Sequence, residues 1–432
     1  MRTFIIVWFG QLISMVGSGM SEFALLLWTW ETTQSATALA LMGFFYALAQ
    51  IPISLFAGIW VDRFNRKKLM MLADMIAALT TVGIGILYFT DSLLIWHIYV
   101  VAAINGGFGQ IQSLAYQTSV SLMVTPRHYA RASSMDSAVQ YGSEIIAPAL
   151  VGILYPLIQL SGLLLIDLTT FLVSVISLLL VRIPQPVKKS TPTESERTIT
   201  RQLTFGLRYV WNQHQLRTLI LVVALFWFVH DLGDTLYEPM ILARTDGDAG
   251  VLAGTAAAAG IGGVTGAIIL SVWGGPKQRI LGMLLGFMGA GLSKVVFGLG
   301  RSPAVWLPTQ FCSSLSFPLL DSSETAIWME STAPEIQGRV FAANELIVQI
   351  VGALAALIAG PLADRALEPM MQSAQEGEAS SPPRLLSYVF GTGPGAGSSI
   401  LYVGCAIAML LIGLVGSLLY EKHIKKAPPS TK

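Results

Sequence analysis

Apolar runs of about 20 residues recur along the chain and are separated by short polar connections. A helix that rises about 1.5 Å per residue needs about 20 apolar residues to cross about 30 Å of hydrocarbon. The runs that meet this length predict twelve membrane-spanning helices over residues 4–30, 36–61, 68–89, 93–118, 130–157, 161–182, 216–242, 250–273, 278–300, 303–329, 339–365 and 398–420. The pattern therefore predicts an all-α polytopic membrane protein.

The longest basic connection divides the predicted helices into two six-helix bundles. It contains a Pro-rich tract and then an amphipathic segment, with Leu203, Leu207, Val210 and Trp211 on one face, that we expect along the membrane surface. The predicted parts are an N-terminal bundle at 1–182, a cytoplasmic linker at 183–215, a C-terminal bundle at 216–420 and a basic cytoplasmic tail at 421–432.

A weak internal repeat relates the two predicted bundles. A shift of 208 residues sets the stretch Pro126 to Arg131 over Pro334 to Arg339, both Pro-x-x-x-x-Arg. Chance matching in a low-complexity apolar sequence is the alternative explanation. A shift of 216 residues also sets Gly17 and Glu22 over Gly233 and Glu238. The consistent order of these matches favours a pseudo-symmetric pair of bundles.

Composition agrees with a membrane protein. Hydrophobic residues make up 53% of the chain, charged residues 12%, and mean hydropathy is +0.64, whereas about 25% of the residues of a soluble domain are charged. The net charge of +1 says little about partners, because in a membrane protein the position of the charges matters more than their sum.

The distribution of basic residues predicts the orientation. Placing both termini on the same side as the central linker gathers 21 of the 26 Lys and Arg residues there. Basic loops stay in the cytoplasm, so we expect a plasma (inner) membrane protein with cytoplasmic N- and C-termini.

A tight basic turn separates the second and third predicted helices. Its residues follow the pattern Gly58-x-x-x-Asp62-Arg63-x-x-Arg66-Lys67. Asp62 can accept a hydrogen bond from Arg66 or from the N-terminal amides of a neighbouring helix. Alternatively, the cluster of basic residues that also includes Lys68 serves only to anchor the topology on anionic lipid.

This turn resembles the signature loop of the major facilitator superfamily. The Pro-x-x-x-x-Arg loops and the segment 206–210, Gly-Leu-Arg-Tyr-Val, are most similar to its macrolide-efflux and enterobactin-exporter branch. The resemblance implies a cytoplasmic latch in which Asp62 reaches the start of the eleventh helix near Arg339. The equivalent loop of the second half, residues 274–279, lacks the acidic residue, so the implied latch is one-sided.

Ionisable and polar residues inside the predicted helices are the candidates for a transport site, since charges at membrane depth normally face a cavity or the bundle interior. The first helix carries a stripe that includes Gln11 and Glu22, and the seventh carries Asp231, Asp234 and Glu238 on one helical face. Three ionised carboxylates on one face repel one another, so a shared cavity would make one of them a proton site.

The other candidates lie in four further helices. They are Glu144, Lys294, Asp321 and Glu324, and the polar face formed by Asn105, Gln112 and Tyr116. Each has an alternative explanation: Glu22 and Glu238 lie near helix ends, where water hydrates them, and Lys294 is expected as an ion-pair partner of an acid rather than as a substrate contact.

The sequence predicts a secondary active transporter and not an enzyme. It has no Gly-x-x-x-x-Gly-Lys-Ser/Thr loop, no nucleophile motif and no metal-ligand spacing. The resemblance implies export of a hydrophobic or amphiphilic, macrolide-like compound in exchange for protons, with the proton gradient as energy source and no cofactor. We expect a monomer in the lipid bilayer that binds no nucleic acid.

Two alternatives stay open. One is the export of a siderophore, a peptide natural product or a lysophospholipid by the same fold. The other, from a different class, is a transport-inactive membrane receptor or scaffold.

Overall fold

The computed structural model describes residues 2–125, 128–183, 199–333, 336–375 and 381–426. These residues form helices joined by short turns, and no strand occurs among them. The first part of the chain forms α1 (Arg2–Thr33), α2 (Ala36–Arg63), α3 (Arg66–Phe89), α4 (Ile95–Met123) and α5 (Tyr129–Leu180). The second part forms α6 (Ile199–Asn212), α7 (His214–Asp234), α8 (Tyr237–Arg244), α9 (Ala249–Trp273), α10 (Arg279–Leu299), α11 (Pro303–Ser331), α12 (Gln337–Leu362), a π-helical turn (Ala363–Leu367), α13 (Glu368–Gln375), α14 (Ser381–Phe390) and α15 (Ala396–Lys426).

The all-α membrane class predicted from the apolar pattern is confirmed. Among the described residues, nine helices are long and apolar enough to cross a membrane. They do not include α4 and α11, whose polar residues, such as Gln112 and Asp321, lower their hydropathy. The count of twelve spanning helices therefore stays a prediction.

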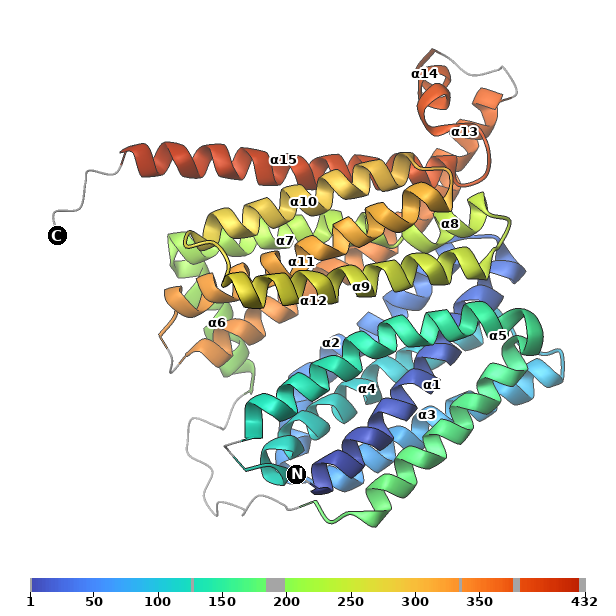
Figure 1. Cartoon of the computed structure of the whole chain (residues 1–432), viewed down its shortest axis with the longest axis vertical. Coiled ribbons are helices and arrows are strands. Elements are labelled where there is room, and N and C mark those ends of the chain that lie inside the picture. Colours follow the sequence, from blue (N-terminus) through green and yellow to red (C-terminus); the bar gives the residue numbers. More distant parts are fainter. Residues whose placement is uncertain (1, 126–127, 184–198, 334–335, 376–380, 427–432) are drawn as a thin grey trace. The chain divides into compact units, whose positions relative to one another are not determined.

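Helix α5 covers two of the predicted spans and turns back on itself between them (Figure 1). The reversal occurs at Gln159, whose φ of 52° and ψ of −167° are not helical. Pro156 lies just before this point; a proline ring inside a helix removes a backbone hydrogen bond and crowds the preceding turn. We refer below to the residues after Gln159 as the second part of α5.

The single predicted helix at 216–242 is interrupted, which is a correction to the sequence interpretation. Helix α7 ends at Asp234 and α8 begins at Tyr237. Pro239 has no amide hydrogen to donate to the carbonyl of Thr235, so an uninterrupted helix would lose a hydrogen bond there. Glu238 therefore lies in the first turn of α8 and does not share a helix with Asp231 and Asp234.

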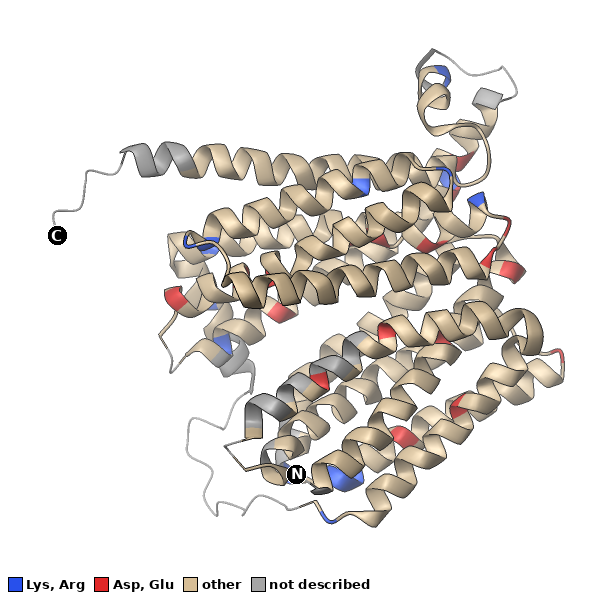
Figure 2. Ribbon diagram, in the orientation of Figure 1, with Lys and Arg blue, Asp and Glu red and all other residues tan. Residues whose placement is uncertain are grey.

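The chain forms two compact units. Unit 1 comprises residues 1–200 and 247–257, and unit 2 comprises residues 201–246 and 258–432. In unit 1, α1 packs against α5, α2 packs against α4, and α3 packs against both α4 and α5. In unit 2, α10 packs against α11 and α15, and α7 packs against α12 and α15. Figure 2 shows acidic residues along the length of the helices of both units, not only in the connections.

The amphipathic segment expected along the membrane surface forms α6, and part of it packs on other helices of unit 2. Val210 is buried in a cluster with residues of α7, α11 and α12, whereas Trp211 is exposed. Gly206 lies against the backbone carbonyl of Arg339 so closely that a Cβ would overlap it. Glycine is therefore needed where α6 meets the first turn of α12.

Candidate functional site

A cavity of about 260 Å³ lies in unit 2, between α7, α11 and α12. Its lining combines aromatic, acidic and amide side chains: Trp227, Asp321, Glu324, Thr325, Trp328, Phe341, Asn344, Glu345 and Val348. We call this the acidic aromatic cavity. It brings together two of the acids predicted from the sequence with Trp227, which comes from a distant part of the chain.

Glu324 is the most enclosed acid of this cavity, with 8% of its surface exposed. Its Oε1 accepts hydrogen bonds from Trp328 Nε1 and from Asn344 Nδ2, both at 3.2 Å. Asp321, one helical turn earlier, and Glu345 on α12 are exposed. A neutral network thus fixes one carboxylate, while the other two acids make the cavity a favourable site for positive charge.

Lys294 and Asp234 form an ion pair between α10 and α7. Lys294 Nζ lies 2.6 Å from Asp234 Oδ1, and it also lies 5.5 Å from the centre of the Tyr402 ring. The lysine is therefore bound to an acid, which was one of the roles considered for it. On the same helix as Asp234, His230 Nδ1 lies 2.9 Å from Asp231 Oδ1.

Two other acids expected at the transport site stand apart from these groups. Glu22 on α1 and Glu144 on α5 have exposed side chains. Among the described residues, no hydrogen bond or ion pair joins either of them to another candidate acid. Their role as proton sites stays a prediction.

Unit 1 contains a buried polar network that sequence reasoning found only in part. The expected residues Gln11 and Gln112 are joined, with Gln112 Nε2 donating to Gln11 Oε1 at 2.6 Å. Both surround Asp74, a buried acid on α3 that the sequence analysis did not identify. A second unidentified acid, Asp167 in the second part of α5, is also buried. The available signal was a single carboxylate inside an otherwise apolar run.

The remaining members of the predicted polar face of α4 have separate partners. Asn105 Oδ1 accepts a hydrogen bond from Thr80 Oγ1 at 3.1 Å. Tyr116 Oη donates to Asp136 Oδ1 at 2.6 Å. The face is thus shared between α3 and α5 and does not line one common site.

The basic turn between α2 and α3 binds carbonyl groups within unit 1. Arg66 Nη1 donates to the carbonyl of Thr118 at 2.7 Å, near the end of α4. Lys67 Nζ donates to the carbonyl of Val181, just after α5, at 2.8 Å. Cations stabilise the C-terminal ends of helices. Arg66 and Lys67 therefore hold the ends of α4 and α5 close to the start of α3.

The predicted latch stays a prediction. The surroundings of Gly58 and the side chain of Asp62 lie outside the described part of the structure, and Arg63 is exposed. Arg339 is exposed as well, and its guanidinium lies 5.1 Å from the centre of the Phe205 ring on α6.

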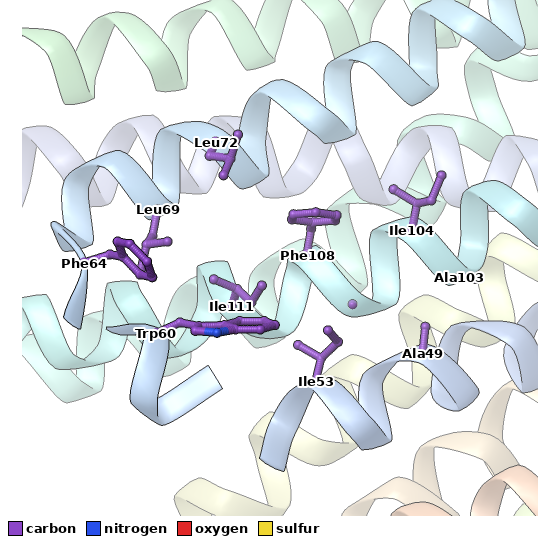
Figure 3. A pocket seen from close by; sticks show the side chains of 11 residues that line it. Ala49, Ile53, Trp60, Phe64, Leu69, Leu72, Ala103, Ile104, Phe108 and Ile111 are labelled. Atoms are coloured by element: carbon purple, nitrogen blue, oxygen red, sulfur yellow. The ribbon is translucent and has the colours of Figure 1, made fainter. Parts of the chain in front are cut away.

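A second cavity, of about 350 Å³, lies in unit 1 between α2, α3 and α4. Figure 3 shows apolar side chains directed into it, among them Trp60, Phe64, Phe108 and Ile111. It offers volume and apolar contact without charged groups, so it suits a hydrocarbon chain better than a polar ligand.

An all-helical chain with many apolar helices and acids at membrane depth has the features of a polytopic membrane transporter. The family model of the Major Facilitator Superfamily matches residues 7–371. The chain therefore belongs to this superfamily; it is a multi-pass membrane transporter of small molecules and not an enzyme.

Several relatives are named as efflux proteins. Macrolide efflux protein A of Streptococcus pyogenes is 25% identical over 368 residues, which cover 84% of this chain and 89% of that protein. The multidrug efflux pump Tap of Mycobacterium tuberculosis is 25% identical over 379 residues, covering 84% of this chain and 87% of that protein.

Solved structures share the fold. The crystal structure of the nucleoside transporter NupG has a TM-score of 0.66 and 10% identity, covering 97% of this chain and 99% of that one. A bacterial homologue of the human lysosomal transporter Spinster, in an inward-facing and unoccupied conformation, has a TM-score of 0.67 and 16% identity, covering 97% and 95%.

Proposed function

We propose that this chain exports a hydrophobic or amphiphilic compound of the macrolide-like class in exchange for protons. Relatives named as macrolide and multidrug efflux proteins support the direction and the substrate class. The absence of a phosphate-binding loop from the sequence supports an ion gradient as the energy source.

The observation that carries the proposal is the lining of the acidic aromatic cavity. Trp227 and Phe341 offer apolar surface for the body of an amphiphile, and Asp321, Glu324 and Glu345 offer negative charge. Such a combination binds an apolar compound with a basic group better than a neutral sugar or an anion.

We propose the plasma (inner) membrane as the location, with both termini in the cytoplasm. The concentration of basic residues on one side of the predicted topology supports this orientation. We also propose that the protein functions as a monomer, since alternating access within one chain needs no second copy.

The test uses everted membrane vesicles that contain the protein and have an acidic lumen. We expect them to accumulate a radiolabelled macrolide and to lose this accumulation when an ionophore removes the pH gradient. Accumulation that is unaffected by the ionophore would refute proton exchange.

Two variants test the cavity. Trp227→Ala removes apolar contact worth about 1–3 kcal/mol, so we expect KM to rise about tenfold or more. The matched control is Trp211→Ala, because Trp211 is 57% exposed on α6 and does not line the cavity. Equal KM values for the two variants would exclude this cavity as the substrate site.

The same vesicles separate the alternatives. Flux of a catecholate siderophore, a peptide or a lysophospholipid, without flux of a macrolide, would favour a different substrate class. The absence of flux for every compound in the panel would favour a receptor or scaffold.

A further inference from the structure

Two layers of polar side chains cross unit 1, and each layer contains one buried acid. Asp74 on α3 is 8% exposed and Asp167 in the second part of α5 is 6% exposed. None of the functional candidates predicted from the sequence includes either residue. Both acids lie inside apolar helices, where an uncompensated charge costs several kcal/mol.

The first layer surrounds Asp74. Its Oδ1 accepts from Gln112 Nε2 at 3.2 Å, and its Oδ2 lies 3.2 Å from Ser174 Oγ. Ser174 Oγ in turn accepts from Gln11 Nε2 at 2.9 Å. Asp74 therefore accepts from one amide of α4 and one hydroxyl of α5, and Gln11 of α1 joins the layer through Ser174.

The second layer surrounds Asp167. Ser18 Oγ lies 3.0 Å from Oδ1 of this acid, and Thr81 Oγ1 lies 2.9 Å from Oδ2. Ser21, one turn further along α1, is 6% exposed and lies beside Asp167. Two hydroxyls thus donate to Asp167, and a third lies close to it.

The two layers are related by a regular spacing. Each of the three helices that contribute to both layers does so with residues seven positions apart: Gln11 and Ser18 on α1, Asp74 and Thr81 on α3, and Asp167 and Ser174 on α5. Seven residues are two helical turns, or about 10 Å along the axis. The two layers therefore lie on the same faces of α1, α3 and α5, two helical turns apart, and we call them together the polar seam.

The charged groups on the surrounding helices are engaged elsewhere or exposed. Arg66 and Lys67 of α3 donate to backbone carbonyls, and Asp136 of α5 accepts from Tyr116 of α4. Glu31 of α1 accepts from Tyr155. The other charged or titratable groups on α1 to α5 with described side chains are exposed or lie near helix ends, and they are Glu22, Tyr46, Arg63, Lys68, Tyr88, His97, Tyr99 and Glu144. His128 lies just before α5.

Within the described part of unit 1, no Lys, Arg or His forms an ion pair with Asp74 or Asp167. Because no basic side chain in this part of unit 1 balances these two buried carboxylates, a different positive charge must neutralise them. A proton or a small cation can supply it.

The donors in the seam favour a proton. The amide nitrogen of Gln112 points at Asp74 and would repel a metal cation at that oxygen, since an amide NH₂ only donates. A hydroxyl donates to a carboxylate or accepts from a protonated carboxyl group. Ser174, Ser18 and Thr81 therefore keep their hydrogen bonds to the acids in both protonation states.

We propose that Asp74 and Asp167 are the proton-binding residues through which unit 1 couples transport to the proton gradient. Oδ2 of Asp74, facing Ser174, takes the proton in the first layer because Oδ1 is held by an amide donor. The inference rests on the proton exchange in the proposed function, and it replaces exposed Glu22 and Glu144 with two enclosed acids.

The first measurement compares driven and passive transport for Asp74→Asn and Asp167→Asn in everted vesicles. Coupling to one proton across about one pH unit sustains about tenfold accumulation. We expect both variants to lose this accumulation while substrate exchange without a gradient stays within about twofold of the unmodified protein, because the cavity in unit 2 is intact. The matched control, Glu31→Gln, should keep both activities.

Two results would overturn the proposal. One is driven accumulation in both Asn variants equal to that of the control. The other is equal loss of driven accumulation and exchange, which would indicate a structural role for the two acids.

A second measurement needs neither substrate nor a folded variant. A hydrophobic carbodiimide reacts with protonated carboxyl groups in apolar surroundings, and mass spectrometry of the unmodified full-length protein locates the adduct. We expect adducts at Asp74 and Asp167 that decrease as pH rises. Labelling confined to other acids would refute the inference, whereas labelled acids in a protein without pH-driven transport would refute only the proposed function.

Discussion

The ion pair between Lys294 and Asp234 leads to an asymmetric prediction. The lysine side chain is 5% exposed and the aspartate side chain 47% exposed. Asp234→Asn leaves an enclosed ammonium without a counter-charge, whereas Lys294→Met leaves a half-exposed carboxylate. We therefore expect the aspartate variant to be the less stable of the two, although both remove the same pair.

The magnitude follows from the distance between the charges. At the observed 2.6 Å, Coulomb's law gives about 6 kcal/mol of attraction at an effective dielectric constant of about 20 and about 1.6 kcal/mol in water. Desolvation of the lysine offsets part of this attraction. Because the lysine side chain is far more enclosed than the aspartate side chain, we expect Asp234→Asn to cost about 3 kcal/mol and Lys294→Met about 1 kcal/mol.

The assay is unfolding of the purified protein in mild detergent, followed by intrinsic fluorescence. The double variant should be more stable than Asp234→Asn alone, since it removes the unpaired charge. The control is Glu330→Gln, which breaks a 3.9 Å pair whose acid is 68% exposed and should cost less than about 1 kcal/mol. Equal effects of the two single variants would refute the reasoning.

Two further predictions concern helix packing. Lys67→Gln should destabilise unit 1 by about 0.3–1 kcal/mol, because the lysine binds carbonyls at the end of α5; Lys68→Gln, at an exposed position, should leave the unfolding midpoint unchanged. Gly291→Ala should cost about 1–3 kcal/mol, since a Cβ there would lie 2.8 Å from the backbone nitrogen of Leu410. Gly404→Ala on the same helix pair meets nothing within 4 Å and should be neutral or stabilising in the same unfolding assay; equal costs for the two alanine variants would contradict the close approach.

The helical architecture was predictable because the length of an apolar run sets the length of a membrane helix. The exception arises from local backbone chemistry, because Pro239 separates α8 from α7. The reversal of α5 at Gln159, a residue of positive φ, falls between the predicted spans 130–157 and 161–182. The proline was visible in the sequence, but the exact residue that adopts a left-handed conformation depends on how the following helix packs.

Acids close together on one helix were the easiest to place. Asp321 and Glu324, three residues apart on α11, line one cavity, whereas the face expected for Asp231, Asp234 and Glu238 is broken between α7 and α8. Asp74 was missed because its partners are far away in sequence: Ser174 lies 100 residues further along the chain. The spacing of polar residues along one helix cannot predict a hydrogen-bond network whose members come from three other helices.

The two units carry their acids in different chemical settings. In unit 2, Asp234 has a lysine partner and Glu324 is bound by two neutral donors at the edge of a cavity. In unit 1, Asp74 and Asp167 are bound by amides and hydroxyls, with no ion pair in the described part of that unit. The two proposals accordingly assign proton binding to unit 1 and substrate binding to unit 2.

Such sites share no side chain, so one can affect the other only by changing the equilibrium between conformations. Suppose that a bound proton lowers the affinity for substrate by some factor. Thermodynamic linkage then requires that bound substrate lowers the affinity for the proton by the same factor. Exchange follows from this reciprocity without a direct contact between proton and substrate. The basic turn supports this scheme, because Arg66 and Lys67 bind carbonyls at the ends of α4 and α5. These contacts link three of the four helices that form the seam.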